Sequence, residues 1–507
     1  MKPSKPELGP RGTSEQSSSE IRFAPDHDAT LEELTNALAS LRAATDPDLR
    51  RRAELVDDLD RRGRERVVAL AETLAGVAPR TAEERRTWSS LCSFWREDAL
   101  ALTAVLKEYF VGAPGAVRLA KTLPPRIVRT IRSFASLVKL LSLRYAPLND
   151  ELWKELGFVY ALAEQREVLG DEVAVDGQTS SARSEFVHLI MFACSAPENL
   201  TPARLQLADR LTAIFASGFE LTTDPRPGSI YWIDLAATLG PQRYIKQVPP
   251  SATLRFLAAP KALEAVDLAI GSTLVSGALP QNLSAVAPSD AGEVLTVLRH
   301  LRAHWSTRLP ARRHKRVPVH SEIKVAWGLD SILDLLDPPR RQFLIDMATG
   351  APLATWTTED ISHGGLSARA PAGDEEWLAI GVLVSLQVTQ QDGWQLGVVQ
   401  RLRRTADGEF LVGIEMLSRA PRAVTAVPDR LGPGASESAI LLSEPKGGGE
   451  VELLLSPGRH VATTSLFVRI GNKSFRLDRE QVVRTGTDYE LVNCRVTMRQ
   501  ISWEQVD

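Results

Sequence analysis

Cysteine is scarce in this chain of 507 residues, which contains only Cys92, Cys194 and Cys494. Their odd number and wide spacing argue against a disulfide framework and against a cysteine-based zinc site, and they fit a reducing cytoplasm. His300 and His304 have the spacing of two zinc ligands on a helix, but the sequence contains no HExxH motif and no evident third ligand. We therefore expect no metal site and no bound cofactor.

Long apolar runs are also missing. No uninterrupted apolar segment reaches the roughly 20 residues that span a bilayer. The first twenty residues are rich in Ser, Pro, Glu and Lys and lack the apolar core of a secretory signal. We expect a cytoplasmic protein without membrane insertion. The formal net charge is only −3, so the chain as a whole has no general attraction to nucleic acid, and we expect no nucleic-acid partner.

Local signatures of catalysis are absent as well. The sequence contains no GxSxG nucleophile elbow, no GxxxxGK[ST] phosphate loop and no GxGxxG after a predicted strand. Serine, histidine and aspartate occur, but without a local pattern they do not indicate a catalytic site. The sequence therefore favours a protein that is not an enzyme.

The first half of the chain shows a helical pattern. Residues 1–28 are poor in large hydrophobic side chains and are expected to form a disordered tail. Residues 29–307 are predicted to form an all-α region. Thr30 and Glu33 have the spacing of a capping box, and four leucines at spacings of three and four follow on one helix face. Further helices are expected at 47–76, 81–110, 126–144, 150–167, 184–194, 202–217, 259–270 and 290–305.

The period changes to that of β-strands after Pro310. The dipeptides Asp392-Gly393 and Asp407-Gly408 lie between β-rich segments and indicate hairpins. Several short antiparallel strands with such turns predict a small barrel or sandwich. Strands are expected around 317–325 and at 353–361, 380–389, 394–403, 409–417, 450–455, 464–470, 474–477 and 489–498, with a further edge strand near 439–442.

Two short segments of the first β-region stand out. One reads Arg-Arg-His-Lys-Arg from Arg312 to Arg316, and the other reads Asp-Ile-Ser-His-Gly-Gly from Asp360 to Gly365. Together they match the RxxxR and (D/N)xSxxG motifs of the PilZ family, with Ser362 at the serine position. Residues 312–420, about a fifth of the chain, therefore resemble a PilZ domain.

The resemblance implies a six-stranded antiparallel barrel and a ligand, cyclic-di-GMP. The predicted fold is thus multidomain α plus β, with an N-terminal all-α helical region followed by a PilZ-type antiparallel six-stranded β-barrel and a small C-terminal β-module. The predicted boundaries are a helical domain at 29–307, a PilZ-like barrel at 308–428, a partly flexible linker at 429–449 and the β-module at 450–507.

The residue types of the two motifs suit this ligand. The guanidinium groups of Arg312 and Arg316 can donate paired hydrogen bonds to a phosphate or to the O6/N7 edge of guanine. Asp360 can accept hydrogen bonds from guanine N1–H and N2–H. Ser362 adds a small donor and acceptor, and Gly365 permits a positive φ or a close approach of the ligand. Family members often bind two intercalated ligand molecules, which implies a role for Arg313 as a third cation.

One departure from the family pattern is the long gap between the motifs. Residues 328–350 look like an insertion, with a helical turn expected at 331–336. The leading hypothesis is a cytoplasmic cyclic-di-GMP receptor whose barrel reorients or exposes the helical domain for a protein partner. The alternatives are a ligand-independent adaptor with a degenerate nucleotide site and, with less support, an enzyme with an unfamiliar helical domain.

Overall fold

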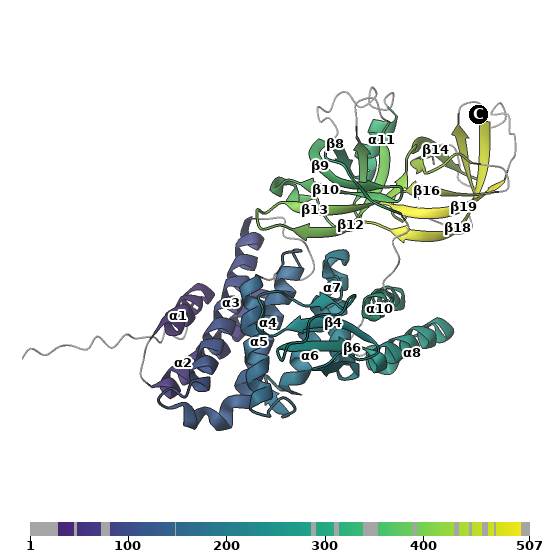
Figure 1. Ribbon diagram of the computed structural model, residues 1–507. Helices are drawn as coiled ribbons and strands as arrows, with labels where there is room; N and C mark the ends of the chain where they lie inside the picture. The colour runs from purple at the N-terminus through teal and green to yellow at the C-terminus, as the bar shows by residue number, and fades with distance from the viewer. Residues whose placement is uncertain are drawn as a thin grey trace, which may run out of the picture.

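The computed structural model shows a helical region with two β-units beside it (Figure 1). It describes residues 29–44, 48–71, 82–147, 149–284, 290–308, 314–337, 353–388, 393–429, 436–445, 449–458, 465–470 and 473–497. The predicted tail at 1–28 lies outside the described residues.

The helices begin and end close to the positions that the sequence predicted. At the first of them, the Glu33 carboxylate accepts a hydrogen bond from the Thr30 amide at 2.7 Å, and the Glu33 amide donates to the Thr30 hydroxyl, so the capping box is confirmed. The helices are α1 (Leu31–Ala43), α2 (Leu49–Ala71), α3 (Ala82–Phe110), α4 (Leu123–Ser142), α5 (Asp150–Gln165), α6 (Ala182–Ala193), α7 (Pro202–Phe215), α8 (Pro260–Ser276), α9 (Gln281–Ser284) and α10 (Ala291–Trp305), with 3-10 turns η2 (Ala116–Thr122), η3 (Pro197–Asn199) and η4 (Ala216–Gly218).

The helical region also contains short strands, which corrects the prediction that it is all-α. They are β1 (Val173–Val175), β2 (Gln178–Ser180), β3 (Glu220–Thr222), β4 (Ser229–Asp234), β5 (Gln242–Arg243) and β6 (Leu254–Ala258). The first two form a hairpin, and the other four form a sheet in the order β3-β6-β4-β5. Strands this short show too few alternations to be recognised, and β6 is buried at every position, which hides its period.

The first β-unit is a ring of six antiparallel strands. Its strands are β8 (Glu322–Trp327), β9 (Leu353–Ser362), β10 (Gly365–Ala370), β11 (Leu383–Gln387), β12 (Gln395–Arg404) and β13 (Phe410–Ser418). They pair in the order β8-β9-β10-β13-β12-β11, and β11 pairs again with β8 to close the ring. The short strand β7 (Val317–Pro318) adds to β9 beside β8. The barrel with six antiparallel strands after a helical region confirms the predicted fold class.

Tryptophans fill one end of this barrel. Trp377 stacks on Trp327 with ring centroids 4.0 Å apart and contacts the buried Trp356 on its other side, at 5.6 Å. Trp356 donates a hydrogen bond to Asp374 at 2.6 Å, which satisfies its indole nitrogen. These rings anchor the core and do not form an exposed binding stripe.

The second β-unit is a closed barrel that is larger than the predicted small β-module. Its strands are β14 (Arg422–Pro428), β15 (Glu437–Leu441), β16 (Glu450–Leu455), β17 (Ser465–Ile470), β18 (Lys473–Thr485) and β19 (Glu490–Thr497). Strand β14 pairs with β15 and β17 here, although the sequence placed it with the first barrel. Strand β15 lies within the segment 429–449 that was predicted as a linker, and it is part of the ring rather than an edge strand.

The described part of the predicted insertion is a helix between the two barrels. Helix α11 (Leu329–Leu336) begins after β8, at the end of the barrel where Ala326 pairs with Leu353. Asp360 lies near the other end of the long strand β9, so α11 does not border the motif. The helix and both barrels share one buried cluster, made of Leu329, Ile332, Leu333, Leu383, Leu396, Val398, Ile440, Leu442, Leu454, Tyr489 and Leu491.

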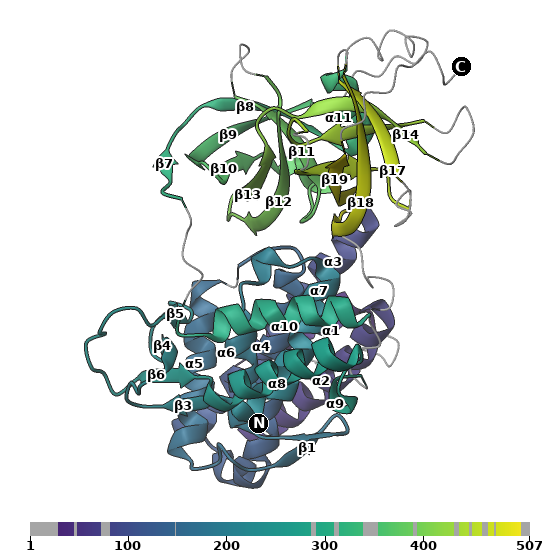
Figure 2. The ribbon, with the colours of Figure 1, turned by 90° about the vertical axis from the view of Figure 1, so that its right-hand side faces the viewer.

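The contact between the helical region and the first barrel has a different character. Strands β12 and β13 form the side of the barrel nearest to the helical region (Figures 1 and 2). Tyr145 follows α4 and packs into the core of the barrel, where its backbone carbonyl accepts a hydrogen bond from the Arg404 amide at 2.8 Å. Beside this contact, Arg401 of β12 forms an ion pair with Glu198 of η3 at 3.1 Å.

Candidate ligand-binding site

The chain leaves the helical region at a firmly held point. Arg243 donates hydrogen bonds to the carbonyls of His304, at 2.7 Å, and of Ser306, and its guanidinium lies 4.8 Å from the Tyr231 ring. These contacts fix the end of α10. The two predicted site residues Arg312 and Arg313 follow shortly afterwards and lie outside the described residues.

The structure brings Arg316 and Asp360 together across 44 positions of sequence. Nη1 of Arg316 lies 2.9 Å from Oδ1 and 3.1 Å from Oδ2 of Asp360. The contact follows from the fold, because β7 begins at Val317, which pairs with Ile361 of β9. Side chains of Arg316 and Asp360 keep 40% and 27% of their exposed area, so a molecule from solution can reach both.

Ser362 and Gly365 shape the turn between β9 and β10. The Ser362 hydroxyl donates a hydrogen bond to the Gly365 carbonyl at 3.0 Å, which holds the turn closed. A Cβ atom at Gly365 would lie 2.2 Å from the carbonyl oxygen of Ile414, so the neighbouring strand requires glycine here. The sequence suggested that glycine serves here either to adopt a positive φ or to let the ligand approach closely. The first reason does not apply, because Gly365 is extended within β10.

The outer face of the barrel continues from Asp360 as a row of residues across four strands. Asp360 pairs with Ser367, Ser367 with Gly413, and Gly413 with Arg401. Paired residues point to the same face of a sheet. The residues next to the row along each strand, such as Leu366, belong to the core, so the row itself faces outward. The two middle residues of the row, Gly413 and the buried Ser367, are small and form a floor between the acid at one end and the arginine at the other.

Two further groups border the turn that carries the second motif. Nη2 of Arg419, just after β13, donates to the carbonyls of Ser362 at 3.4 Å and His363 at 3.2 Å. The rings of His314 and His363 lie 5.0 Å apart, which places His314 beside the turn. Sequence reasoning missed Arg419, because no motif marks it and only the pairing of β10 with β13 brings it near.

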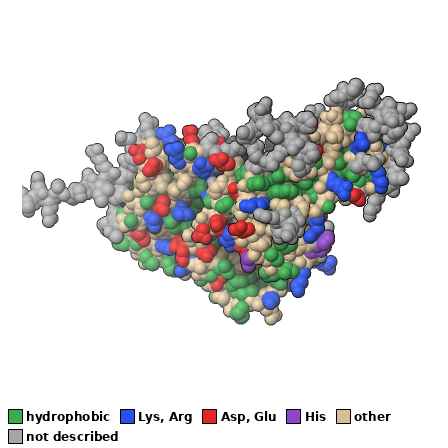
Figure 3. All heavy atoms as spheres, turned by 90° about the horizontal axis from the view of Figure 1, so that it is seen from above, with side chains coloured by type: hydrophobic (Ala, Val, Ile, Leu, Met, Phe, Trp, Pro, Cys, Tyr) green, Lys and Arg blue, Asp and Glu red, His purple; other side chains and the backbone are tan. Residues whose placement is uncertain are grey.

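The face of the molecule seen from above shows no broad patch of one charge among its described residues (Figure 3). In the view from above, the coloured Lys, Arg, Asp and Glu side chains are intermingled (Figure 3).

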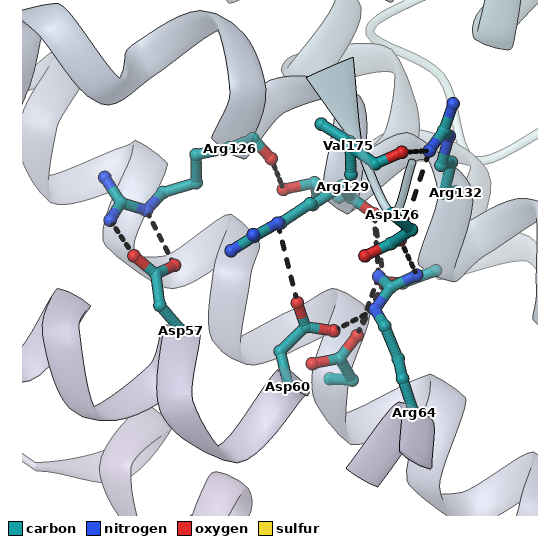
Figure 4. A network of polar contacts seen from close by, with 11 residues as sticks. Asp57, Asp60, Arg64, Arg126, Arg129, Arg132, Val175 and Asp176 are labelled. Atoms are coloured by element: carbon teal, nitrogen blue, oxygen red, sulfur yellow. Dashed lines mark hydrogen bonds and ion pairs between the residues drawn. The ribbon is translucent and has the colours of Figure 1, made fainter. Parts of the chain in front are cut away.

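A second polar cluster lies inside the helical region (Figure 4). Arg64 forms an ion pair with Asp60, and its Nη2 donates to the Ser133 hydroxyl at 3.0 Å. Ser133 in turn donates to the fully buried Asp98 at 2.6 Å, while Arg129 faces Asp60 from the other side at 3.9 Å. Two neighbouring acids, Asp60 and Asp98, lie here beside two arginines, which indicates a structural network that joins α2, α3 and α4.

Burial controls the protonation of this network. Removal from water, together with the nearby charge of Asp60, raises the pKa of the Asp98 carboxyl well above its usual range. Burial also raises the pKa of Asp60, although the charges of Arg64 and Arg129 oppose this effect. No motif joins Asp60 and Asp98, because they belong to different helices. Each lies four residues from a buried apolar residue of its own helix, Val56 and Leu102, and this spacing was the signal that sequence reasoning missed.

Within the described ranges, no group of three or more His, Cys, Asp and Glu side chains has the arrangement of a metal site. His300 instead contacts the Ser195 carbonyl at 2.6 Å. The part of the chain that the structure describes also contains no helix of the length and apolarity that crossing a membrane requires.

Comparison with known proteins adds a finding for the helical region. Residues 24–226 match the family described as the N-terminal domain of the cyclic-di-GMP receptor FimW. The matched segment contains helices α1 to α7 and ends shortly after strand β3. It includes neither barrel. No curated protein sequence matches the chain. The segment with a family match is thus the one for which sequence reasoning named no family.

Proposed function

We propose that this protein is a non-enzymatic receptor for cyclic-di-GMP and that the ligand binds on the outer face of the first barrel, between the hinge at Arg316 and the strands β9 and β10. The contact between Arg316 and Asp360 is the observation that carries the proposal, because it brings the two halves of the PilZ-like motif to one place. The family match lies in another part of the chain and points independently to the same ligand.

The two side chains would bind complementary parts of the ligand. Arg316 would exchange Asp360 for a phosphate or for the O6/N7 edge of a guanine. Asp360 would then accept hydrogen bonds from N1–H and N2–H of a guanine. An ion pair as exposed as this one contributes about 0–1 kcal/mol, so breaking it opposes binding only weakly.

The position of the site suggests how binding is transmitted. Arg243 holds the end of α10, and β7 begins at Val317, so the motif arginines lie on the short connection between two fixed points. A ligand that binds the arginines of this connection biases the orientation of the barrels relative to the helical region. The output is the exposure of a surface of the helical region to a protein partner in the cytoplasm.

Calorimetric titration of the full chain with cyclic-di-GMP tests the proposal. Arg316→Ala and Asp360→Ala should each abolish or greatly weaken binding, while Arg316→Lys should restore little, because an ammonium cannot form the paired hydrogen bonds. Arg403→Ala is the matched control, since this exposed arginine lies on β12 of the same barrel. Absence of binding to the unaltered protein at micromolar concentrations would sink the proposal.

The same ion pair favours a second function, that of a ligand-independent adaptor. Arg316 and Asp360 satisfy one another without a ligand, as a degenerate site would. For an adaptor, the double variant Arg312→Ala/Arg316→Ala should bind its protein partner and support function normally. A receptor should lose ligand-dependent partner binding in that variant.

A further inference from the structure

The ion pair between Arg401 and Glu198 connects two units of the molecule at the edge of the proposed site. Nη2 of Arg401 lies 3.1 Å from Oε1 of Glu198, and the two residues are 203 positions apart in the sequence. Their side chains keep 46% and 27% of their exposed area. The pair is therefore accessible to a small molecule and to salt.

Local backbone geometry directs Arg401 to the outer face. The register of β12 and β13 shifts between Val399 and Arg401. Because of this bulge, two consecutive residues, Gln400 and Arg401, both lie on the outer face of the barrel. Leu402, the next residue, returns to the core. A Cβ atom at Gly413 would lie 3.0 Å from Cβ of Arg401, so this glycine leaves room for the arginine stem.

Arg401 ends the row that begins at Asp360. The two are separated by Ser367 and Gly413 alone, across three strand spacings of about 4.8 Å each. An anion lying on this floor, with one end at Arg316, extends toward Arg401.

A carboxylate and a phosphate oxygen compete for the same guanidinium donors. Glu198 therefore occupies the position that a ligand phosphate would take on Arg401. Tyr145 and the Arg404 amide form a separate contact between the same two units, and this contact does not involve the row. Loss of the ion pair would leave that contact as a pivot.

We propose that Arg401 is a further phosphate-binding residue of the cyclic-di-GMP site and that the ligand displaces Glu198 from it, which loosens the helical region from the barrel. This inference rests on the proposed function. The coupling is reciprocal, so a change that removes Glu198 from Arg401 and keeps the arginine should favour ligand binding, and the ligand should favour separation at this edge.

Titration of three full-length variants with cyclic-di-GMP tests the exchange. Arg401→Gln should weaken binding about 10-fold, because one cation is lost. Glu198→Gln should tighten binding several-fold, because the competitor is lost while the arginine remains. The double variant Arg401→Glu/Glu198→Arg restores an ion pair of reversed polarity, and it should bind as weakly as Arg401→Gln. Arg403→Gln is the control and should bind normally.

A second measurement reports the separation directly. Hydrogen exchange at η3 and the start of α7 should rise when the ligand is added to the unaltered protein, and it should be high without ligand in Glu198→Gln. Unchanged affinity in Arg401→Gln or in Glu198→Gln, in a protein that binds the ligand and loses it on Arg316→Ala, overturns this inference alone. Failure of the unaltered protein to bind overturns the proposed function instead.

Discussion

The two interfaces of the first barrel differ in chemistry. Towards the second barrel, helix α11 and strands of both units bury a continuous apolar cluster in which Ile332, Ile440 and Leu454 are fully inaccessible. Towards the helical region, the core of the barrel receives the buried aromatic ring of Tyr145, which follows α4, beside an exposed ion pair. The first interface resembles the interior of a domain, and the second resembles a contact that forms and breaks.

This difference predicts which units of the molecule move relative to one another. Large apolar interfaces hold domains in one orientation, whereas small polar ones permit relative motion. We therefore expect the two barrels to move as one body and the helical region to move against them. The proposed ligand site lies at the second kind of interface, where a few new hydrogen bonds can shift an equilibrium.

The largest effect is expected from a charge in the apolar interface. Ile332→Asp places a carboxylate in the cluster shared by α11 and both barrels and should lower the free energy of unfolding by about 4 kcal/mol or more. Urea unfolding measures this loss. Asp330→Ala, at an exposed position of the same helix, should stay within about 0.5 kcal/mol of the unaltered protein. Equal midpoints for the two variants would refute the apolar interface.

Removal of the aromatic anchor should have the next largest effect. Tyr145→Ala should cost about 3 kcal/mol, because a buried ring is lost from the barrel core. Tyr145→Phe keeps the ring and loses only the hydrogen bond to the Leu200 carbonyl, so it should cost about 1 kcal/mol. Scanning calorimetry should show a separate transition of the helical region in the alanine variant alone. Coincident transitions would mean that Tyr145 does not couple the units.

A third test concerns the polar interior of the helical region. Asp98→Ala should cost about 2 kcal/mol, because Ser133 loses its buried acceptor, whereas Asp98→Asn should cost less. The pKa of Asp98 is higher in the native state than in the unfolded chain, where it is about 4. The proton bound to native Asp98 therefore contributes its full stability below that unfolded pKa, and this contribution is lost as the pH rises through the native pKa. Between pH 4 and 8, the free energy of unfolding of Asp98→Asn should therefore rise relative to that of the unaltered protein as the pH rises. Urea unfolding at a series of pH values measures this difference.

The control for the pH series is Asp171→Asn, at an exposed position of the same region. Its stability should follow that of the unaltered protein across the range. A constant difference between Asp98→Asn and the unaltered protein at every pH would show that Asp98 does not change protonation between the two states.

The smallest effect is expected for the interdomain ion pair. Glu198→Gln should lower the free energy of unfolding by only about 0.5 kcal/mol, since exposed pairs contribute little. The difference should disappear at about 1 M salt, where the Debye length is roughly 3 Å. A loss larger than that of Tyr145→Ala would reverse the ranking of the two contacts and remove the basis for a weak, switchable joint.

Local signals in the sequence located most of the regular structure. The capping box at Thr30 and the leucine spacing placed α1, and the Asp407-Gly408 dipeptide marked the β12–β13 hairpin, where Gly408 has a φ of 84°. The two motif segments identified Arg316 and Asp360 as partners before their contact was seen. Each of these signals acts within a few residues, or within a motif whose spacing is already known.

Other features had no local signal. Strand β10 (Gly365–Ala370) was missed because it is short and its apolar positions are mixed with Ser367 and Arg369. The assignment of β14 to the second barrel depends on its partners β15 and β17, and neither pairing is encoded in β14 itself. Arg401 falls inside the predicted strand at 394–403, and its acidic partner Glu198 belongs to a different unit.

The sequence by itself determined where the period changes from helix to strand, where helices begin, and which residue types meet in the (D/N)xSxxG segment. Tertiary structure decided which strands close each ring, that α11 lies between the barrels, and that Arg401 faces Glu198. The physical reason is the separation along the sequence over which each kind of interaction acts. Backbone propensity and capping act over three or four residues, whereas ring closure, apolar burial and ion pairing depend on which distant surfaces the folded chain brings into contact.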